Sequence, residues 1–154
     1  MPRRLFPLLA LVPLLLASCR PPLSMEQFVR AEDRAADGYH FSADLADTAH
    51  TYDFTFYTRL DGRAEELPAE ALPLTVTWLS PSLERFTETV WLDVSGRADS
   101  WFSRQIYAPY RRGVAVREPG WWQLVVDMPE TPALRGLGLR VAKTKLDDGT
   151  RQTP

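Results

Sequence analysis

The chain has 154 residues, with 18 basic and 20 acidic side chains and a formal net charge of −2. A charge so close to neutral, with no clustered basic surface, excludes proteins that hold nucleic acid through its phosphates. A single cysteine excludes disulfide bonds within the chain, so the fold must rest on the burial of apolar side chains. The length suits one domain.

Residues 1–18 have the order of a bacterial secretory signal. Two arginines lie near the start, residues 5–16 are wholly apolar, and two small residues precede Cys19. A membrane-spanning helix needs about 20 apolar residues, so this run is too short to cross a bilayer. The tetrapeptide Leu16-Ala17-Ser18-Cys19 resembles the lipobox of bacterial lipoproteins. That resemblance implies that Cys19 is acylated and becomes the first residue of the mature chain.

Cys19 has two other interpretations. Ordinary signal cleavage would leave a free thiol, which is a liability in an oxidising compartment. A catalytic thiol needs an activating base, and only His40 and His50 could supply an imidazole. We therefore expect a membrane anchor with palmitate or similar chains on Cys19. Each buried methylene contributes about 0.8 kcal/mol, and stable attachment takes more than one chain.

Residues 19–36 are expected to comprise the lipidated cysteine, a tether and a short helix. Residues 20–24 contain two prolines and no periodic pattern, which is typical of a spacer between a bilayer and a domain. Ser24 followed by Gln27 matches a capping box. The sequence therefore predicts a helix from Ser24 to about Ala36.

Apolar and polar residues alternate through residues 37–146, which predicts strands with one buried and one solvated face. The expected buried positions are Tyr39, Phe41, Tyr52, Phe54, Phe56, Leu72, Leu74, Val76, Trp78, Phe86, Val90, Leu92, Val94, Trp122, Leu124, Val126, Met128, Leu137, Leu139 and Val141. Thr55, Tyr57, Arg59, Thr75 and Thr77 are expected on the solvated faces.

Turn signals separate these segments at Asp61-Gly62, Pro81, Gly96, Pro109, Gly113, Pro119-Gly120 and Pro132. The proline-rich residues 66–74 are interpreted as a connection that crosses between strands. Together these patterns predict an all-β domain at residues 37–146, an antiparallel β-sandwich of about seven or eight strands. A flexible tail is expected at residues 147–154.

The order of motifs along these segments resembles the gliding-motility lipoprotein family (GldH). The motifs are "YHFSADLADTAHTYDFTFYTRL", "LSPS", "TETVWLDV", "YRRGVAV", "PGWWQLVVDMPE" and "LRGLGLRVAKT". The resemblance implies a lipid-anchored envelope protein of gram-negative bacteria, linked in gliding species to surface motility and its secretion machinery. It implies no catalytic residue and no cofactor. The chain departs from the family in its longer proline-rich connection at residues 64–73.

Residues after Cys19 bear on location. Residue 20 is Arg rather than the Asp that commonly retains bacterial lipoproteins in the inner membrane, so the outer membrane is favoured. Surface-displayed lipoproteins of this bacterial group often carry an acidic cluster after the cysteine, and residues 20–24 contain none. We therefore expect the domain to face the periplasm from the outer membrane.

Aromatic and arginine side chains concentrate binding energy at interfaces. Candidates for contact with a protein partner or a glycan are Trp101, Tyr107, Tyr110, Arg111 and Trp121. The alternative for the tryptophans is packing, with Trp122 buried, Trp121 on the opposite face and Trp101 over one end of the sandwich.

Catalytic and metal signatures are weak. His40 and His50, with three nearby aspartates, match no zinc spacing, and no metal or cofactor is expected. The sequence has no phosphate-binding loop and no Gly-x-Ser-x-Gly elbow. We therefore expect no enzyme. The first hypothesis is an accessory envelope protein that acts through protein contacts, and the second is a glycan-binding module on the outer membrane. A third, an envelope hydrolase, would need a concave pocket with convergent titratable groups.

Overall fold

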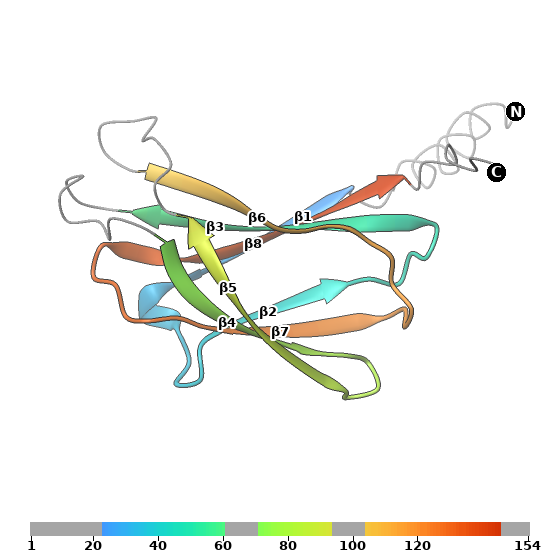
Figure 1. Cartoon of the computed structure of the whole chain (residues 1–154), viewed down its shortest axis with the longest axis horizontal. Helices are drawn as coiled ribbons and strands as arrows, with labels where there is room; N and C mark the ends of the chain where they lie inside the picture. The colour runs from blue at the N-terminus through green and yellow to red at the C-terminus, as the bar shows by residue number, and fades with distance from the viewer. Residues whose placement is uncertain (1–22, 61–70, 94–103, 146–154) are drawn as a thin grey trace, which may run out of the picture.

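The computed structural model describes residues 23–60, 71–93 and 104–145, which form eight strands and one short 3₁₀ helix (Figure 1). In chain order these are β1 (Ser24–Arg30), η1 (Ala31–Asp33), β2 (Tyr39–Asp44), β3 (His50–Leu60), β4 (Ala71–Leu79), β5 (Arg85–Asp93), β6 (Arg104–Val114), β7 (Trp121–Asp127) and β8 (Leu134–Lys145). They make two four-stranded antiparallel sheets that pack face to face. The predicted antiparallel β-sandwich is confirmed.

The strand order explains which strands lie at the edges. Sheet one is ordered β1-β8-β3-β6, and sheet two is ordered β2-β7-β4-β5. Eight strands in this order form a jelly roll. β1 and β2 are the edge strands on one lateral side of the sandwich, and β6 and β5 are the edge strands on the other.

The core lies between the two sheets and is built from alternate residues of each strand. Phe54 from β3, Leu124 from β7 and Leu137 from β8 are fully buried. All the core positions predicted in β2, β3, β4, β7 and β8, and Met128 just after β7, are confirmed as buried or, for Trp122, half-buried. Replacing one of the buried phenylalanines by alanine is expected to cost about 3–5 kcal/mol.

Core positions predicted in β5 are confirmed only in part. Leu92 is buried and Val90 is half-buried, but Phe86 is 52% exposed. β5 is an edge strand, and its first half borders an open cleft instead of the opposite sheet. Val94 lies outside the described residues.

The predicted helix at Ser24–Ala36 is wrong. Residues 24–30 form strand β1, which pairs with β8 from Ser24↔Ala142 to Arg30↔Gly136. Alternate residues Met25, Gln27 and Val29 pair with buried residues of β8 and face the core, so a period of two replaces the helical one. The sandwich therefore begins by residue 24, not at residue 37.

Helical structure among the described residues is limited to η1, a single 3₁₀ turn. No helix in this part of the chain is long and apolar enough to span a bilayer.

The sequence does not predict β6, because Pro109 and Gly113 are typical of turns. Both lie within this edge strand. A proline is tolerated there because an edge strand has one side without a ladder partner. The pairing with β3 jumps from Thr55↔Pro109 to Phe54↔Arg111, which is a β-bulge. The turns predicted at Pro81, at 119–120 and at Pro132 do separate strands.

An aromatic row crosses the outer face of sheet one. Phe28, Gly138, Tyr57 and Tyr107 pair in register across β1, β8, β3 and β6. Tyr57 lies over Gly138 between the two other rings, with ring centroids 5.8 Å from Phe28 and 5.4 Å from Tyr107. Tyr57 is therefore on the predicted outer face, but it is only 4% exposed.

Polar side chains bridge the two sheets on both lateral sides. Between β1 and β2, the Gln27 amide donates to the Ser42 carbonyl at 2.6 Å and accepts from the Ser42 backbone N–H at 3.0 Å. Between β5 and β6, Glu88 faces Arg111 at 2.7 Å. The β5–β6 side is where the sandwich opens.

Candidate functional site

The five predicted contact residues do not form one patch. Tyr107 projects from the outer face of sheet one, whereas Trp121 projects from the outer face of sheet two. Tyr110 and Arg111 lie together at the β5–β6 side. Trp101 lies outside the described residues. Of the four candidates that are described, only Tyr110 and Arg111 are brought together.

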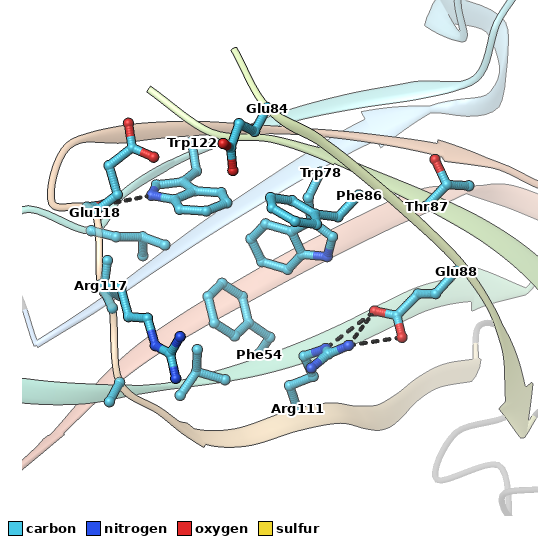
Figure 2. Close-up of a pocket in the computed structure, with 14 residues that line it drawn as sticks. Phe54, Trp78, Glu84, Phe86, Thr87, Glu88, Arg111, Arg117, Glu118 and Trp122 are labelled. Atoms are coloured by element: carbon cyan, nitrogen blue, oxygen red, sulfur yellow. Dashed lines mark hydrogen bonds and ion pairs between the residues drawn. The ribbon is translucent and has the colours of Figure 1, made fainter. Parts of the chain in front are cut away.

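A cleft of about 580 Å³ opens beside these two residues, between β5 and the connection from β6 to β7 (Figure 2). Phe54, Trp78 and Trp122 make its aromatic floor, and Phe86 stands at its mouth. The charged side chains around it are Glu84, Glu88, Arg111, Arg117 and Glu118. A concave apolar surface with a few convergent polar groups is the usual form of a binding site.

The bulge in β6 builds one side of the cleft. Because Tyr110 is the extra residue of the bulge, Tyr110 and Arg111 both reach Glu88 on β5 instead of pointing to opposite faces. Arg111 Nη2 donates to both carboxylate oxygens of Glu88, at 2.7 and 2.8 Å, and Arg111 Nε donates to Oε1 at 3.1 Å. The Tyr110 hydroxyl also donates to Glu88.

Glu88 and Tyr110 in this cluster each keep one ionisation state at neutral pH. Burial opposes ionisation of Glu88, but hydrogen bonds from Tyr110 and Arg111 and the Arg111 charge outweigh it and hold the pKa of Glu88 below its ordinary value. Burial, followed by the hydrogen bond to Glu88, raises the pKa of Tyr110 to about 12. Glu88 is therefore an anion and Tyr110 a neutral phenol across the physiological range.

The floor is rigid because its indoles are hydrogen-bonded. Trp78 Nε1 donates to the Tyr110 hydroxyl at 2.8 Å, and Trp122 Nε1 donates to the Glu118 carbonyl at 3.0 Å. The two indole planes are 78° apart with centroids at 6.0 Å. The Phe86 ring stacks on Trp122 at 6.5 Å and 27°. The tryptophans therefore form a folded apolar floor and no single flat platform.

Charges of both signs surround the cleft. Figure 2 shows the Arg117 guanidinium on one side and the Glu84 carboxylate on the other, with Phe54 and Trp122 among the side chains between them. Glu118 accepts a hydrogen bond from Ser82 at 3.0 Å, which ties the β6–β7 connection to the β4–β5 turn. These positive and negative side chains can pair with the two ends of a polar or zwitterionic segment.

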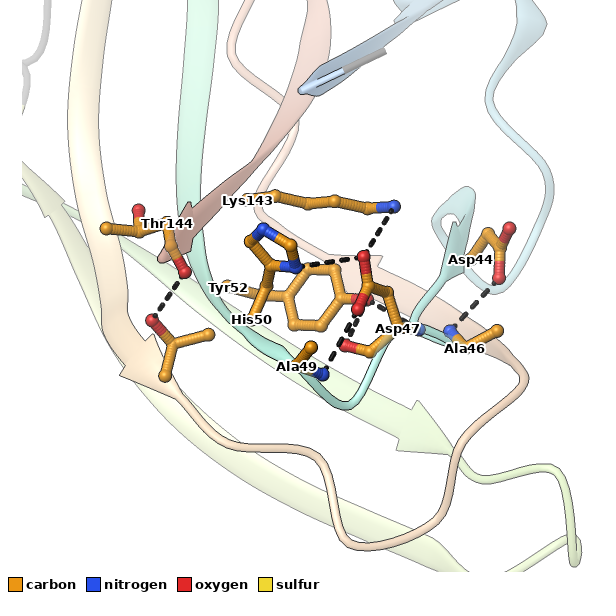
Figure 3. Close-up of polar contacts among 9 residues, drawn as sticks. Asp44, Ala46, Asp47, Ala49, His50, Tyr52, Lys143 and Thr144 are labelled. Atoms are coloured by element: carbon orange, nitrogen blue, oxygen red, sulfur yellow. Dashed lines mark hydrogen bonds and ion pairs between the residues drawn. The ribbon is translucent and has the colours of Figure 1, made fainter. Parts of the chain in front are cut away.

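The histidines lie elsewhere. His50 Nδ1 is 2.9 Å from Asp47 Oδ2, and Lys143 Nζ is 3.7 Å from the same oxygen (Figure 3). The Asp47 backbone N–H donates to the Tyr52 hydroxyl at 3.0 Å, and that hydroxyl donates to the Asp47 carbonyl at 3.1 Å. The hydrogen bond with His50 holds the pKa of Asp47 below its ordinary value. This cluster braces the β2–β3 loop.

His40 is paired in the same way, 2.7 Å from Asp37. Within residues 23–60, 71–93 and 104–145, no three His, Cys, Asp or Glu side chains are grouped so that they could hold a metal ion.

Several cleft residues were missed at the level of sequence. Trp78 and Phe86 were interpreted as core, and Glu88 and Arg117 were not singled out. A signal was present, because Trp78 and Phe86 are paired across the β4–β5 hairpin and stand on one face of it. The contact between Glu88 and Arg111 depends on the bulge in β6. In the sequence, Gly113 is the only indication of this bulge.

Comparison with known proteins leaves the chain without an assigned family. No protein-family model matches the sequence, and no curated protein is significantly similar to it.

Proposed function

We propose that the chain is a non-enzymatic, lipid-anchored accessory protein of the cell envelope, and that the cleft between β5 and β6 binds a segment of another envelope protein. Cys19 carries the acyl chains, and the domain faces the periplasm from the outer membrane. The resemblance to gliding-motility lipoproteins favours a partner in a motility- or secretion-associated assembly. The lipobox supports the anchor, and the cleft supports the binding role.

The observation that carries the binding role is the position of the cleft at two sheet edges. β5 and β6 each pair with a neighbour on one side only, and the cleft lies between them. An extended peptide bound there would meet a strand edge, aromatic side chains and charges of both signs. Tryptophan, tyrosine and arginine are the residues that most often dominate protein interfaces.

Binding is favoured over catalysis by the ionisation states of the Glu88, Tyr110 and Arg111 cluster. A general acid or base works best with a pKa near the ambient pH. The pKa of Glu88 is lowered and that of Tyr110 is raised to about 12, so both are moved away from neutrality. Their hydrogen bonds with Arg111 and Trp78 instead hold the shape of the cleft.

Cross-linking in cells tests the proposed partner. Phe86 at the mouth of the cleft is replaced by the photo-reactive residue benzoylphenylalanine in the full-length protein. Trp91 is the matched control, because it is an exposed aromatic residue on the opposite face of the same strand. We expect one defined envelope protein to be captured from position 86 and not from position 91, and capture to fall at least tenfold with Glu84→Lys. Equal capture at both positions, or none, would contradict the proposal.

A glycan is the second candidate for the same cleft. It is favoured by the half-exposed Phe86 ring, which is stacked on Trp122 and could lie against a sugar ring. The 78° angle between the indoles weighs against it, because sugar-binding tryptophans offer a flat exposed face. Soluble glycans should change the tryptophan fluorescence of the full-length protein, and Phe86→Ala should abolish that change. No response across a broad glycan panel would exclude this candidate.

A further inference from the structure

Exposed apolar side chains gather at one end of the sandwich. Leu23, Leu83, Phe86 and Trp121 are exposed there, and Leu83 and Trp121 are 74% and 62% exposed. We call this the N-terminal end, defined by the start of β1, loop 45–49, turn 80–84, connection 115–120 and the end of β8. The pairs Ser24↔Ala142, Leu79↔Gln123 and Asp44↔Trp121 place these segments together, and Figure 1 shows them at one end of the molecule.

We propose that the N-terminal end lies against the lipid bilayer, with Leu83 and Trp121 reaching into the interface between headgroups and acyl chains. This inference rests on the proposed anchoring through Cys19. It goes beyond that proposal by assigning an orientation to the domain and a second, non-covalent lipid contact.

The short tether holds this end near the membrane. The Leu23 carbonyl accepts a hydrogen bond from the Lys143 N–H at 2.7 Å, so the chain is fixed to the end of β8 from residue 23. Leu23 is four residues after Cys19, and a fully extended chain spans at most about 3.5 Å per residue, or about 14 Å in total. An acylated Cys19 therefore leaves the N-terminal end within about 14 Å of the bilayer surface.

Leu83 is held in an unfavourable conformation. Its φ is 69°, and it is the one non-glycine residue with positive φ among the described residues. Its N–H donates to the Ser80 carbonyl at 2.9 Å, and Ser80 and Ser82 bond through their hydroxyls at 2.8 Å. A left-handed backbone favours glycine or asparagine. The Leu83 side chain is 74% exposed, so the domain covers little of it, and an exposed leucine in this conformation points to a contact outside the domain.

Trp121 is joined to the same corner. Gly120 has a φ of 142°, and a Cβ there would lie 3.0 Å from Pro81 Cγ. The connection before β7 therefore packs closely on the turn that carries Leu83. Tryptophan is enriched at membrane–water interfaces because its ring is apolar and its N–H is polar.

The charged side chains at the N-terminal end do not favour anionic lipids over zwitterionic ones. Basic residues Arg85, Arg112, Arg117 and Lys143 are matched by acidic residues Asp44, Asp47, Glu84 and Glu118. Electrostatic attraction of a polybasic segment is therefore not the basis of the contact, and we expect it to depend weakly on anionic lipid. The cleft opens near the same end, so its occupant would be bound close to the membrane surface.

Quenching of tryptophan fluorescence by brominated lipids tests the orientation. The full-length lipidated protein is reconstituted in vesicles of zwitterionic lipid with brominated acyl chains. The comparison is between Trp121→Phe and Trp91→Phe, because both tryptophans are highly exposed on the outer face of sheet two but Trp91 lies toward its other end, opposite Pro73. We expect Trp121→Phe to remove most of the quenching and Trp91→Phe to leave it unchanged.

A second variant and a flotation control distinguish an error in the proposed orientation from an error in the proposed anchoring. Leu83→Asn keeps all tryptophans and suits a positive φ, and we expect it to reduce the quenching at least twofold without lowering the thermal midpoint. If the protein does not float with vesicles, the anchoring itself is wrong. If it floats and the two tryptophan variants lose quenching equally, the orientation is wrong and the anchoring stands.

Discussion

Gly138 is the residue that lets the aromatic row lie flat on sheet one. A Cβ built at this position would overlap the ring of Tyr57, which is held between Phe28 and Tyr107. The glycines of residues 136–143, "GLGLRVAK", thus include one with a packing role in this chain. One glycine provides the space that an aromatic neighbour fills.

Gly138→Ala is expected to lower the free energy of unfolding by about 2–4 kcal/mol, because the Tyr57 ring has no free direction in which to move. The matched control is Gly113→Ala, where no atom lies within 4 Å of the added Cβ and only the positive φ of 62° is unfavourable. That variant should cost about 1 kcal/mol. Urea denaturation measures both, and equal losses would contradict the packing explanation.

The charge of the single residue Glu88 helps to hold the shape of the cleft. Its folded-state pKa is lowered, so the stabilisation it gives is present above its ordinary pKa of 4.5 and is lost as the pH falls through the lower folded value. Glu88→Gln should therefore destabilise the domain at pH 7, and its difference from the wild type should be smaller at pH 3. The difference at pH 7 should be about 1 kcal/mol or less, because Arg111 is half exposed.

Denaturation at the two pH values measures this difference. Glu130→Gln, at an exposed glutamate after β7, is the control for the loss of one negative charge. A gap for Glu88→Gln that is the same at pH 7 and pH 3 would show that the carboxylate charge is not what holds β5 to β6.

At the scale of elements, the central strands and the edge strands β2 and β5 were predictable, whereas the edge strands β1 and β6 were not. β3, β4, β7 and β8 bury one full face, so their alternation is visible in the sequence. β1 and β6 have one neighbouring strand each, and they contain polar or irregular residues. Gln27 in β1 matches the pattern of a helix cap, and Pro109 in β6 matches that of a turn. The cleft could not be predicted because its parts meet only when two edges come together.

Gln27 shows why a polar residue belongs on the inner face of an edge strand. Gln27→Met keeps the shape but leaves the Ser42 N–H and carbonyl without their partner, and it should cost about 1–2 kcal/mol. Gln27→Glu removes the donor to the carbonyl and should cost as much. Gln123→Met on the exposed face of β7 is the control and should change stability by less than about 0.5 kcal/mol. Thermal unfolding that ranks all three variants equally would contradict this role.

At the scale of the whole molecule, the sandwich begins five residues after Cys19, the proposed anchor, so the proposed attachment would keep the domain close to the membrane. The segment between Cys19 and the sandwich is shorter than the sequence predicts, because residues 24–30 form the first strand instead of a helix. With the proposed periplasmic location, we expect the domain to survive protease treatment of intact cells and to be degraded once the outer membrane is permeabilised. Loss of the domain from intact cells would place it on the outer surface.

The anchor is the claim on which the orientation and the proposed location both depend. Mass spectrometry of the protein purified from membranes tests it most directly. We predict a mature chain that begins at Cys19, with the mass of that cysteine increased by its acyl chains, and a Cys19→Ser variant that is neither acylated nor cleaved at this site. A mature chain that begins elsewhere and carries an unmodified Cys19 would contradict the account.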